Sequence, residues 1–75
     1  MTAVDQHVAR RIRGKRRALG LSLDDIAKAL GVNREQVEAY ETGAVSVPAE
    51  HLQRLSERFD VPISYFFPDR LPRTA

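Results

Sequence analysis

The chain has 75 residues, of which 43% are hydrophobic and 29% charged, and it contains no cysteine. A chain of this length forms one small domain, and without cysteine it has neither disulfides nor thiolate metal sites. It shows no apolar run near the roughly 18 residues of a membrane span and no signal-peptide pattern, so we expect a soluble cytoplasmic protein. With only two distant histidines, His7 and His51, we also expect no metal, no cofactor and no enzymatic activity.

The net charge of +2 is unevenly distributed along the chain. Residues 1–20 carry a net charge of +5, whereas residues 21–75 carry −3. A cationic end on a small domain favours an anionic partner such as nucleic acid. On charge alone, a basic helix whose side chains are merely solvated is an equally good interpretation.

Apolar residues recur at helical spacing throughout, which predicts an all-α fold of five short helices. The first helix ends at Gly20, and its apolar stripe consists of Val4, Val8, Ile12 and Leu19. The second begins with a capping-box pattern, Ser22 followed by Asp25, and ends at Gly31. Its inner face consists of Leu23, Ile26, Ala27 and Leu30.

Three further helices follow. The third begins at Asn33, the fourth has Pro48 as its first residue, and a short fifth starts at Pro62. The residues expected on their inner faces are Val37, Tyr40, Glu41, Leu52, Leu55, Ser56, Phe59, Ile63 and Phe66. We expect residues 1–67 to form the domain and residues 68–75, which contain two prolines, to form a flexible tail.

The second and third helices are separated by a very short connection. Only Gly31 and Val32 lie between Leu30 and the cap at Asn33, so the two helices must meet at a sharp angle. The small Ala27 allows close crossing. This spacing is typical of the helix-turn-helix, whose second helix lies in the major groove of DNA, although similar helical hairpins occur in purely structural settings.

Two charged residues fall on faces that are otherwise apolar. Arg16 lies four residues after Ile12 on the first helix, and Glu41 lies four residues after Val37 on the third. An unpaired buried charge is costly, so each side chain needs the other. The spacing predicts an ion pair between Arg16 and Glu41.

A longer set of residues extends this pattern over most of the chain, from about Val4 to Phe67. It consists of Ile12-Arg13, Arg16-Arg17, Leu19-Gly20-Leu21-Ser22, Ile26-Ala27, Gly31-Val32-Asn33, Val37, Tyr40-Glu41-Thr42-Gly43, Leu52, Leu55 and Val61. Together these residues resemble the Cro/C1-type helix-turn-helix (XRE) family, and the ending Val61–Phe67 resembles its proteobacterial regulators. The resemblance implies a compact lambda-repressor-like bundle in a nucleoid-associated repressor that binds a short palindromic operator in double-stranded DNA as a dimer.

The same resemblance indicates the DNA contacts. It implies base contacts at Arg34, Glu35 and Ala39, which suit guanine O6 and N7, cytosine N4 and a thymine methyl respectively. It also implies a phosphate contact at Gln36. Further phosphate contacts are expected from Ser22, Arg10, Arg13, Arg17, Thr42 and Ser46.

Phosphate anchoring is where the sequence departs from the family. Leu23 stands where the family usually has glutamine, the loop 44–47 carries no charge, and residues 33–41 total −2. We therefore expect few ionic contacts per protomer and a shallow salt dependence. The alternative function is a protein-interaction module on the same fold, an antitoxin-like or co-regulator subunit with weak or no DNA binding.

An aromatic cluster lies near the end of the domain. Tyr65, Phe66 and Phe67 are three of the five aromatic residues of the chain. We expect them to supply a homodimer interface, because a short helix hides three such rings with difficulty. Core packing is the competing interpretation for Ile63 and Phe66, and Phe67 is the better interface candidate.

Overall fold

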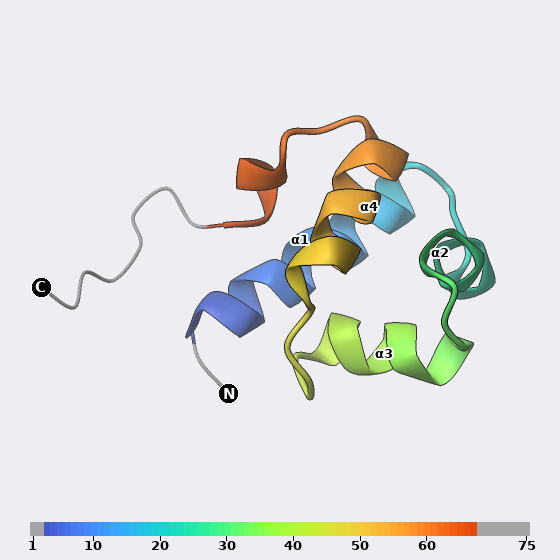
Figure 1. The fold of residues 1–75 in the computed structure, drawn as a ribbon, viewed down its shortest axis with the longest axis horizontal. Helices are drawn as coiled ribbons and strands as arrows, with labels where there is room; N and C mark the ends of the chain where they lie inside the picture. The colour runs from blue at the N-terminus through green and yellow to red at the C-terminus, as the bar shows by residue number, and fades with distance from the viewer. Residues whose placement is uncertain (1–2, 68–75) are drawn as a thin grey trace, which may run out of the picture.

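The computed structural model describes residues 3–67, with side chains from residue 5 onward, so the expected tail and the Val4 side chain lie outside the described residues. Within this range every regular element is a helix (Figure 1). The elements are α1 (Ala3–Ala18), α2 (Leu23–Leu30), α3 (Arg34–Thr42), α4 (Ala49–Phe59) and the 3-10 helix η1 (Ile63–Phe66). The all-α fold and the helix-turn-helix formed by α2 and α3 are confirmed.

The expected fifth α-helix is instead the short 3-10 helix η1. The Tyr65 N–H donates to the Pro62 carbonyl at 2.9 Å, and the Phe67 N–H donates to the Ser64 carbonyl at 3.1 Å. These are the three-residue spacings of a 3-10 helix. Phe67 is already extended, with φ −107° and ψ 151°, so the segment after Pro62 ends before an α-helical turn is complete.

Helices α2 and α3 are bounded by capping residues, which also define the short connection between them. The Ser22 hydroxyl accepts from the Asp25 N–H at 3.0 Å while the Asp25 carboxylate accepts from the Ser22 N–H at 2.8 Å, which completes the capping box. At the other end of α2, Gly31 has a φ of 72°, a conformation that favours glycine. The Asn33 side chain then accepts from the Gln36 N–H at 2.9 Å and starts α3.

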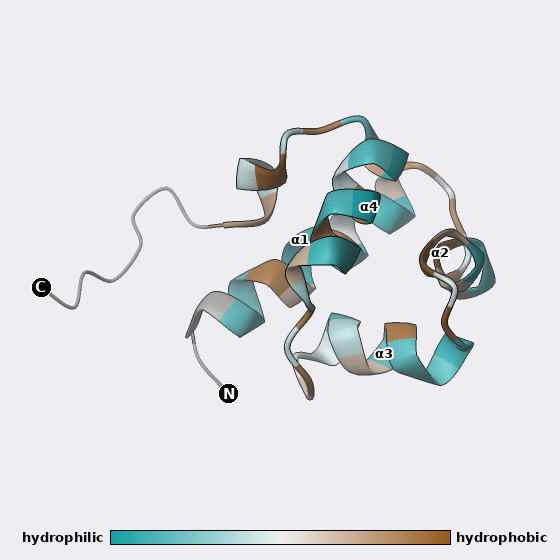
Figure 2. Cartoon of the chain, in the orientation of Figure 1, coloured by the Kyte–Doolittle hydropathy of each residue, from teal (hydrophilic) through white to brown (hydrophobic). Residues whose placement is uncertain are grey.

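The core lies where the four α-helices and η1 meet. Figure 2 shows the hydrophobic side of α2 turned toward the rest of the molecule and its hydrophilic side turned outward. Ile26, Val37, Leu55 and Phe66 are fully buried, so α2, α3, α4 and η1 each contribute to one cluster. Helix α3 packs against both α1 and α2, and these contacts position it at one side of the molecule.

Three expectations about the core and the helix ends are wrong. Leu19 is 46% exposed, because α1 ends at Ala18 and the chain turns at Gly20; Leu21 packs against the core instead. Ile63 is 37% exposed, because the 3-10 turn directs Phe66 inward in its place. Pro48 is the N-cap of α4 rather than its first residue.

Arg16 and Glu41 form the ion pair that their spacing predicts. Arg16 Nε lies 2.6 Å from Glu41 Oε2, and Arg16 Nη2 lies 3.0 Å from Glu41 Oε1. The remaining Arg16 nitrogen, Nη1, donates to the Leu21 carbonyl at 3.0 Å. The hydrogen bond from Arg16 to Glu41 raises the pKa of Arg16, and the side chains are only 13% and 6% exposed. The pair fastens α1 to the end of α3.

We expect Arg16→Ala to destabilise the protein by about 3 kcal/mol, the lower end for breaking a buried pair because Arg16 keeps some solvent contact. Urea unfolding of Arg16→Ala, Glu41→Ala and the double variant measures the coupling between the two side chains. The exposed Arg10→Ala variant is the control and should change the free energy of unfolding by less than about 0.5 kcal/mol. Additive single-variant effects would contradict the pair's structural role.

We expect the contribution of Asp25 to stability to fall in acid. The bonds from the Ser22 backbone and side chain lower the pKa of Asp25 in the folded state. A carboxylate with a lowered folded-state pKa stabilises the fold above its unfolded pKa of about 3.9 and loses that effect as the pH falls further. The difference in unfolding free energy between wild type and Asp25→Asn should therefore shrink below about pH 4.

Urea titrations between about pH 6 and pH 3 measure this difference. Asp24→Asn is the matched control, because it makes the same charge change one residue earlier and leaves the reciprocal cap in place. An Asp25→Asn difference that stays constant over this range would show that the capping carboxylate is not responsible.

Candidate nucleic-acid interface

Helix α3 has one buried face and one exposed face, and we call the exposed face, which includes Arg34, Glu35 and Glu38, the open face. Val37, Tyr40 and Glu41 are buried against the rest of the domain. Arg34 and Glu35, two of the residues expected to contact bases, are exposed at the start of the helix. The buried residues of α3 therefore fix the position of the helix, and the charged side chains of its open face are accessible to a ligand.

The other expected contacts on α3 lie closer to the core. Ala39, the third expected base contact, and Gln36, the expected phosphate contact, are both half-buried. The Gln36 backbone N–H is already bonded to the Asn33 cap. Both residues border the open face, so each can contact a ligand that covers it.

A second charged residue accompanies Arg34 on the open face. Arg34 Nε lies 3.9 Å from Glu38 Oε1, and the side chains are 58% and 54% exposed. Such an exposed pair one helical turn apart adds little stability. The four-residue spacing of Arg34 and Glu38 could have revealed this contact from the sequence.

The open face is less acidic than the sequence count suggests. Of the residues 33–41, Glu41 is buried and paired with Arg16, so its charge is neutralised inside the fold. The exposed charges of α3 are then Arg34 against Glu35 and Glu38. The same ion pair therefore removes one acidic group, Glu41, from the surface of α3 and one basic group, Arg16, from the surface of α1.

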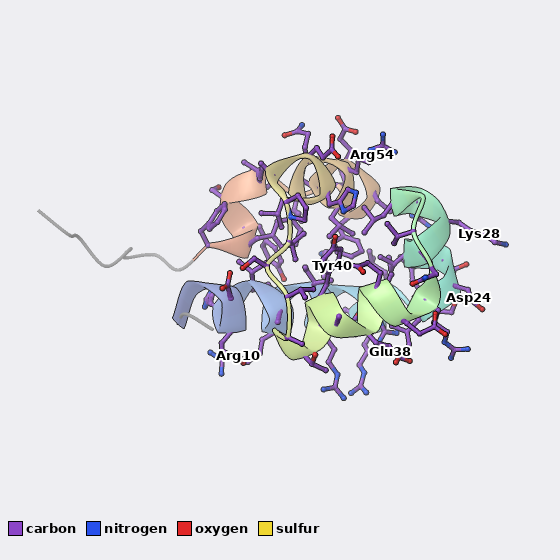
Figure 3. The ribbon with its side chains drawn as sticks, turned by 60° about the horizontal axis from the view of Figure 1, so that its bottom comes forward. Arg10, Asp24, Lys28, Glu38, Tyr40 and Arg54 are labelled. Carbon is purple, nitrogen blue, oxygen red and sulfur yellow. The ribbon has the colours of Figure 1, made fainter. Side chains whose placement is uncertain are left out.

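Three arginines of α1 lie near this face. Arg10, Arg13 and Arg17 are exposed and occupy positions three and four residues apart, which places them on one face of the helix. Figure 3 shows Arg10 and Glu38 projecting toward the same side of the molecule, whereas Arg54 projects from α4 toward the opposite side. The basic face of α1 therefore borders the open face of α3.

The other two cations of α1 have a different role. The Arg11 guanidinium lies 4.9 Å from the centre of the Tyr65 ring, and the Lys15 ammonium lies 5.9 Å from it. Arg11 also donates to His7 Nε2 at 3.3 Å. These cation–π contacts hold η1 against α1. Sequence reasoning missed them because the aromatic partner lies at the other end of the chain.

Three hydroxyl groups were expected to contact phosphates, and all three already bond to groups of the protein. Ser22 Oγ accepts the Asp25 N–H, and the Ser22 side chain also bonds to the Asp25 carboxylate. Thr42 Oγ1 donates to the Ala39 carbonyl at 3.2 Å, and Ser46 Oγ donates to Asp5 Oδ2 at 3.0 Å. Each hydroxyl must therefore give up an internal hydrogen bond before it can donate to a phosphate.

The aromatic cluster divides between core and surface. Phe66 is fully buried, so its expected place in a dimer interface is wrong: its ring fills the space between α1 and α4 and packs against Phe59 at 6.2 Å between ring centres. Tyr65 and Phe67 are half-buried at the edge of the core. Exposed Ile63, on the same short helix, adds to this edge.

A contact that the sequence did not reveal joins α3 to α4. The Tyr40 hydroxyl lies 2.9 Å from His51 Nδ1, and the two rings meet edge to face at 5.8 Å. Figure 3 shows Tyr40 directed into the space between α3 and α4. The contact could not be predicted from the sequence, because the helical spacing accounts for the burial of Tyr40 without a polar partner and nothing indicates a partner for His51.

Among residues 3–67, no cluster of histidine, aspartate or glutamate side chains could hold a metal ion. In the same range, no helix combines the length and the apolar character that crossing a bilayer requires. The candidate interface for nucleic acid consists of the open face of α3, the arginines of α1, and the helix ends beside them.

Comparison with known proteins agrees with this geometry. A 66-residue match, 41% identical, relates the chain to an uncharacterized HTH-type transcriptional regulator of Sinorhizobium medicae and covers 88% of the chain and 48% of that protein. An uncharacterized HTH-type transcriptional regulator of Sinorhizobium fredii is 45% identical over 67 residues, which cover 89% of the chain and 47% of that protein. The chain thus spans about half the length of these curated relatives.

A solved structure is similar over the same region. The restriction-modification controller protein C.AhdI from Aeromonas hydrophila superimposes with a TM-score of 0.79 at 27% identity, covering 88% of this chain and 100% of that one. The helix-turn-helix family matches residues 12–66, from the middle of α1 to the end of η1. The chain therefore belongs to the helix-turn-helix family.

Proposed function

We propose that this chain is the DNA-binding module of a transcriptional regulator, which places α3 in the major groove of a short palindromic operator. The observation that carries the proposal is the open face of α3. Arg34 and Glu35 are exposed on a helix whose inner face is fixed by buried Val37, Tyr40 and the Glu41 ion pair. The names of the relatives, HTH-type transcriptional regulators, support regulation of transcription as the context.

We assign the contacts with DNA bases to residues on the open face and at its border. Arg34 has the two parallel donors that suit guanine O6 and N7, Glu35 can accept from cytosine N4, and Ala39 can contact a thymine methyl. Glu38 lies 3.9 Å from Arg34 Nε, so its negative charge adjoins the position at which Arg34 would meet a base.

Phosphate contacts are proposed from both sides of α3. Gln36 and Ser22 lie at helix N-termini, where backbone N–H groups favour anions. Arg10, Arg13 and Arg17 supply positive charge from α1, and the hydroxyls of Ser22, Thr42 and Ser46 are the weaker candidates because each already bonds within the protein. Three arginines per protomer predict a modest loss of affinity with rising salt.

A homodimer gives the domain two copies of these contacts. Tyr65 and Phe67 are half-buried beside exposed Ile63, which leaves apolar surface at the end of η1 for a second copy of the chain. Two recognition helices spaced about 34 Å apart would read the two halves of a palindrome. Such a dimer acts as a repressor when its operator overlaps a promoter.

We expect the wild-type protein to retard particular fragments from a pool of genomic DNA in gel shifts. Arg34→Ala should cost about 1–3 kcal/mol of binding free energy on those fragments, since it removes a two-bond base contact. Arg54→Ala is the matched control, because Arg54 projects from α4 on the opposite side and its loss changes the net charge equally.

Gel shifts at low and moderate salt separate the two candidate functions. Equal competition by random DNA at every salt concentration would exclude sequence-specific regulation. Absence of any retardation would favour the alternative, a protein-interaction module that uses the acidic residues of α3 and the uncharged loop 44–47.

We expect the protein to sediment as a dimer at micromolar concentration and Phe67→Ser to weaken the dimer about tenfold or more, as loss of an aromatic anchor does at an interface. Analytical ultracentrifugation over a range of concentrations measures this change. Val45→Ser, at an exposed apolar residue in the loop after α3, is the control and should leave association unchanged. A wild-type protein that stays monomeric at every concentration would contradict the dimer.

A further inference from the structure

The loop after α3 is tied to the start of α1 by one side-chain contact. Ser46 Oγ donates a hydrogen bond to Asp5 Oδ2 at 3.0 Å, across 41 residues of sequence. Asp5 lies in the first turn of α1, and Ser46 lies in the loop that precedes α4. This loop directly follows α3, so on the proposed function it approaches the DNA backbone.

The direction of this hydrogen bond matters for phosphate binding. A serine hydroxyl has a single proton, and a phosphate oxygen can only accept one. While Ser46 donates to Asp5, it has no proton left for a phosphate. The Asp5 carboxylate also places a negative charge beside the position that a phosphate would take, and two anions repel each other.

We infer that Asp5 competes with the DNA backbone for Ser46 and lowers the affinity of the domain for DNA of any sequence. This inference rests on the proposed function, because it concerns how α3 and its neighbouring loop meet DNA. Asp5 is a residue that limits affinity and touches no base. Phosphate contacts carry no sequence information, so its effect is uniform across fragments.

The surrounding charges make one carboxylate significant. The loop 44–47 contributes no cation of its own to the surface beside Ser46, and the exposed face of α3 has Arg34 against two glutamates. Non-specific binding to DNA depends chiefly on charge. A carboxylate at the edge of the interface therefore weakens non-specific binding as much as specific binding, and favours release from both.

Removal of the carboxylate tests this inference. We expect Asp5→Ala to tighten binding about two- to tenfold, the range of one net hydrogen bond, on specific and random fragments alike. Alanine suits a helical first turn, so α1 should form normally. Glu57→Ala is the matched control: it removes one negative charge from α4, three residues after Arg54 and on the same face.

Ser46→Ala distinguishes competition for the hydroxyl from loss of charge. In the wild type the Ser46 proton is already donated to Asp5, so Ser46→Ala alone should change the affinity less than about twofold. In the Asp5→Ala background the same substitution should reverse part of the gain, because the released hydroxyl then contacts phosphate. Circular dichroism and thermal unfolding verify that each variant is folded.

The outcomes are separable by gel shift of all five proteins on one specific and one random fragment. If Asp5→Ala binds DNA no more tightly than Glu57→Ala, or more weakly than the wild type, the inference is overturned and the proposed function stays intact. A marked loss of affinity in Ser46→Ala alone also overturns it, because Ser46 would then contact phosphate despite Asp5. No retardation by any of the proteins overturns the proposed function and this inference together.

Discussion

The Arg16–Glu41 pair is the contact on which the arrangement of this domain depends. It crosses from α1 to the last turn of α3 with two nitrogen–oxygen contacts, and a third Arg16 nitrogen holds the Leu21 carbonyl at the entry to α2. One side chain therefore fixes three segments relative to each other. The pair also removes a positive charge from α1 and a negative charge from α3, which decides the electrostatics of the surface that remains.

Contacts between residues close in sequence could be predicted because their signals are local. The Ser22–Asp25 capping box and the turn at Gly31 depend on residues a few positions apart, so the helix-turn-helix is evident before any packing is known. The Arg16–Glu41 pair is distant in sequence, but each charge interrupts an apolar stripe of its own helix. Two such interruptions in a domain this small have only each other as partners.

The remaining contacts depend on how the helices pack against each other, and the spacing of apolar residues along each helix does not predict that packing. The bond from Ser46 to Asp5 joins an uncharged loop to the first turn of α1, and neither residue breaks a pattern in its own segment. Leu19 and Leu21 show the same limit at shorter range. Leu19 fits the apolar stripe of the first helix, and only the exact end of α1 at Ala18 decides that Leu21 is covered and Leu19 exposed.

On the proposed function, these contacts together explain how a weakly charged domain discriminates between DNA sequences. The Arg16–Glu41 pair withdraws one cation from the surface, and Tyr65 holds Arg11 and Lys15 at η1. Non-specific affinity follows the number of phosphates neutralised, whereas specific affinity also includes base contacts. Each cation used inside the fold therefore lowers binding to random DNA without removing a base contact from α3. On the proposed function, a dimer doubles the base contacts as well, so discrimination comes from paired reading helices rather than from charge.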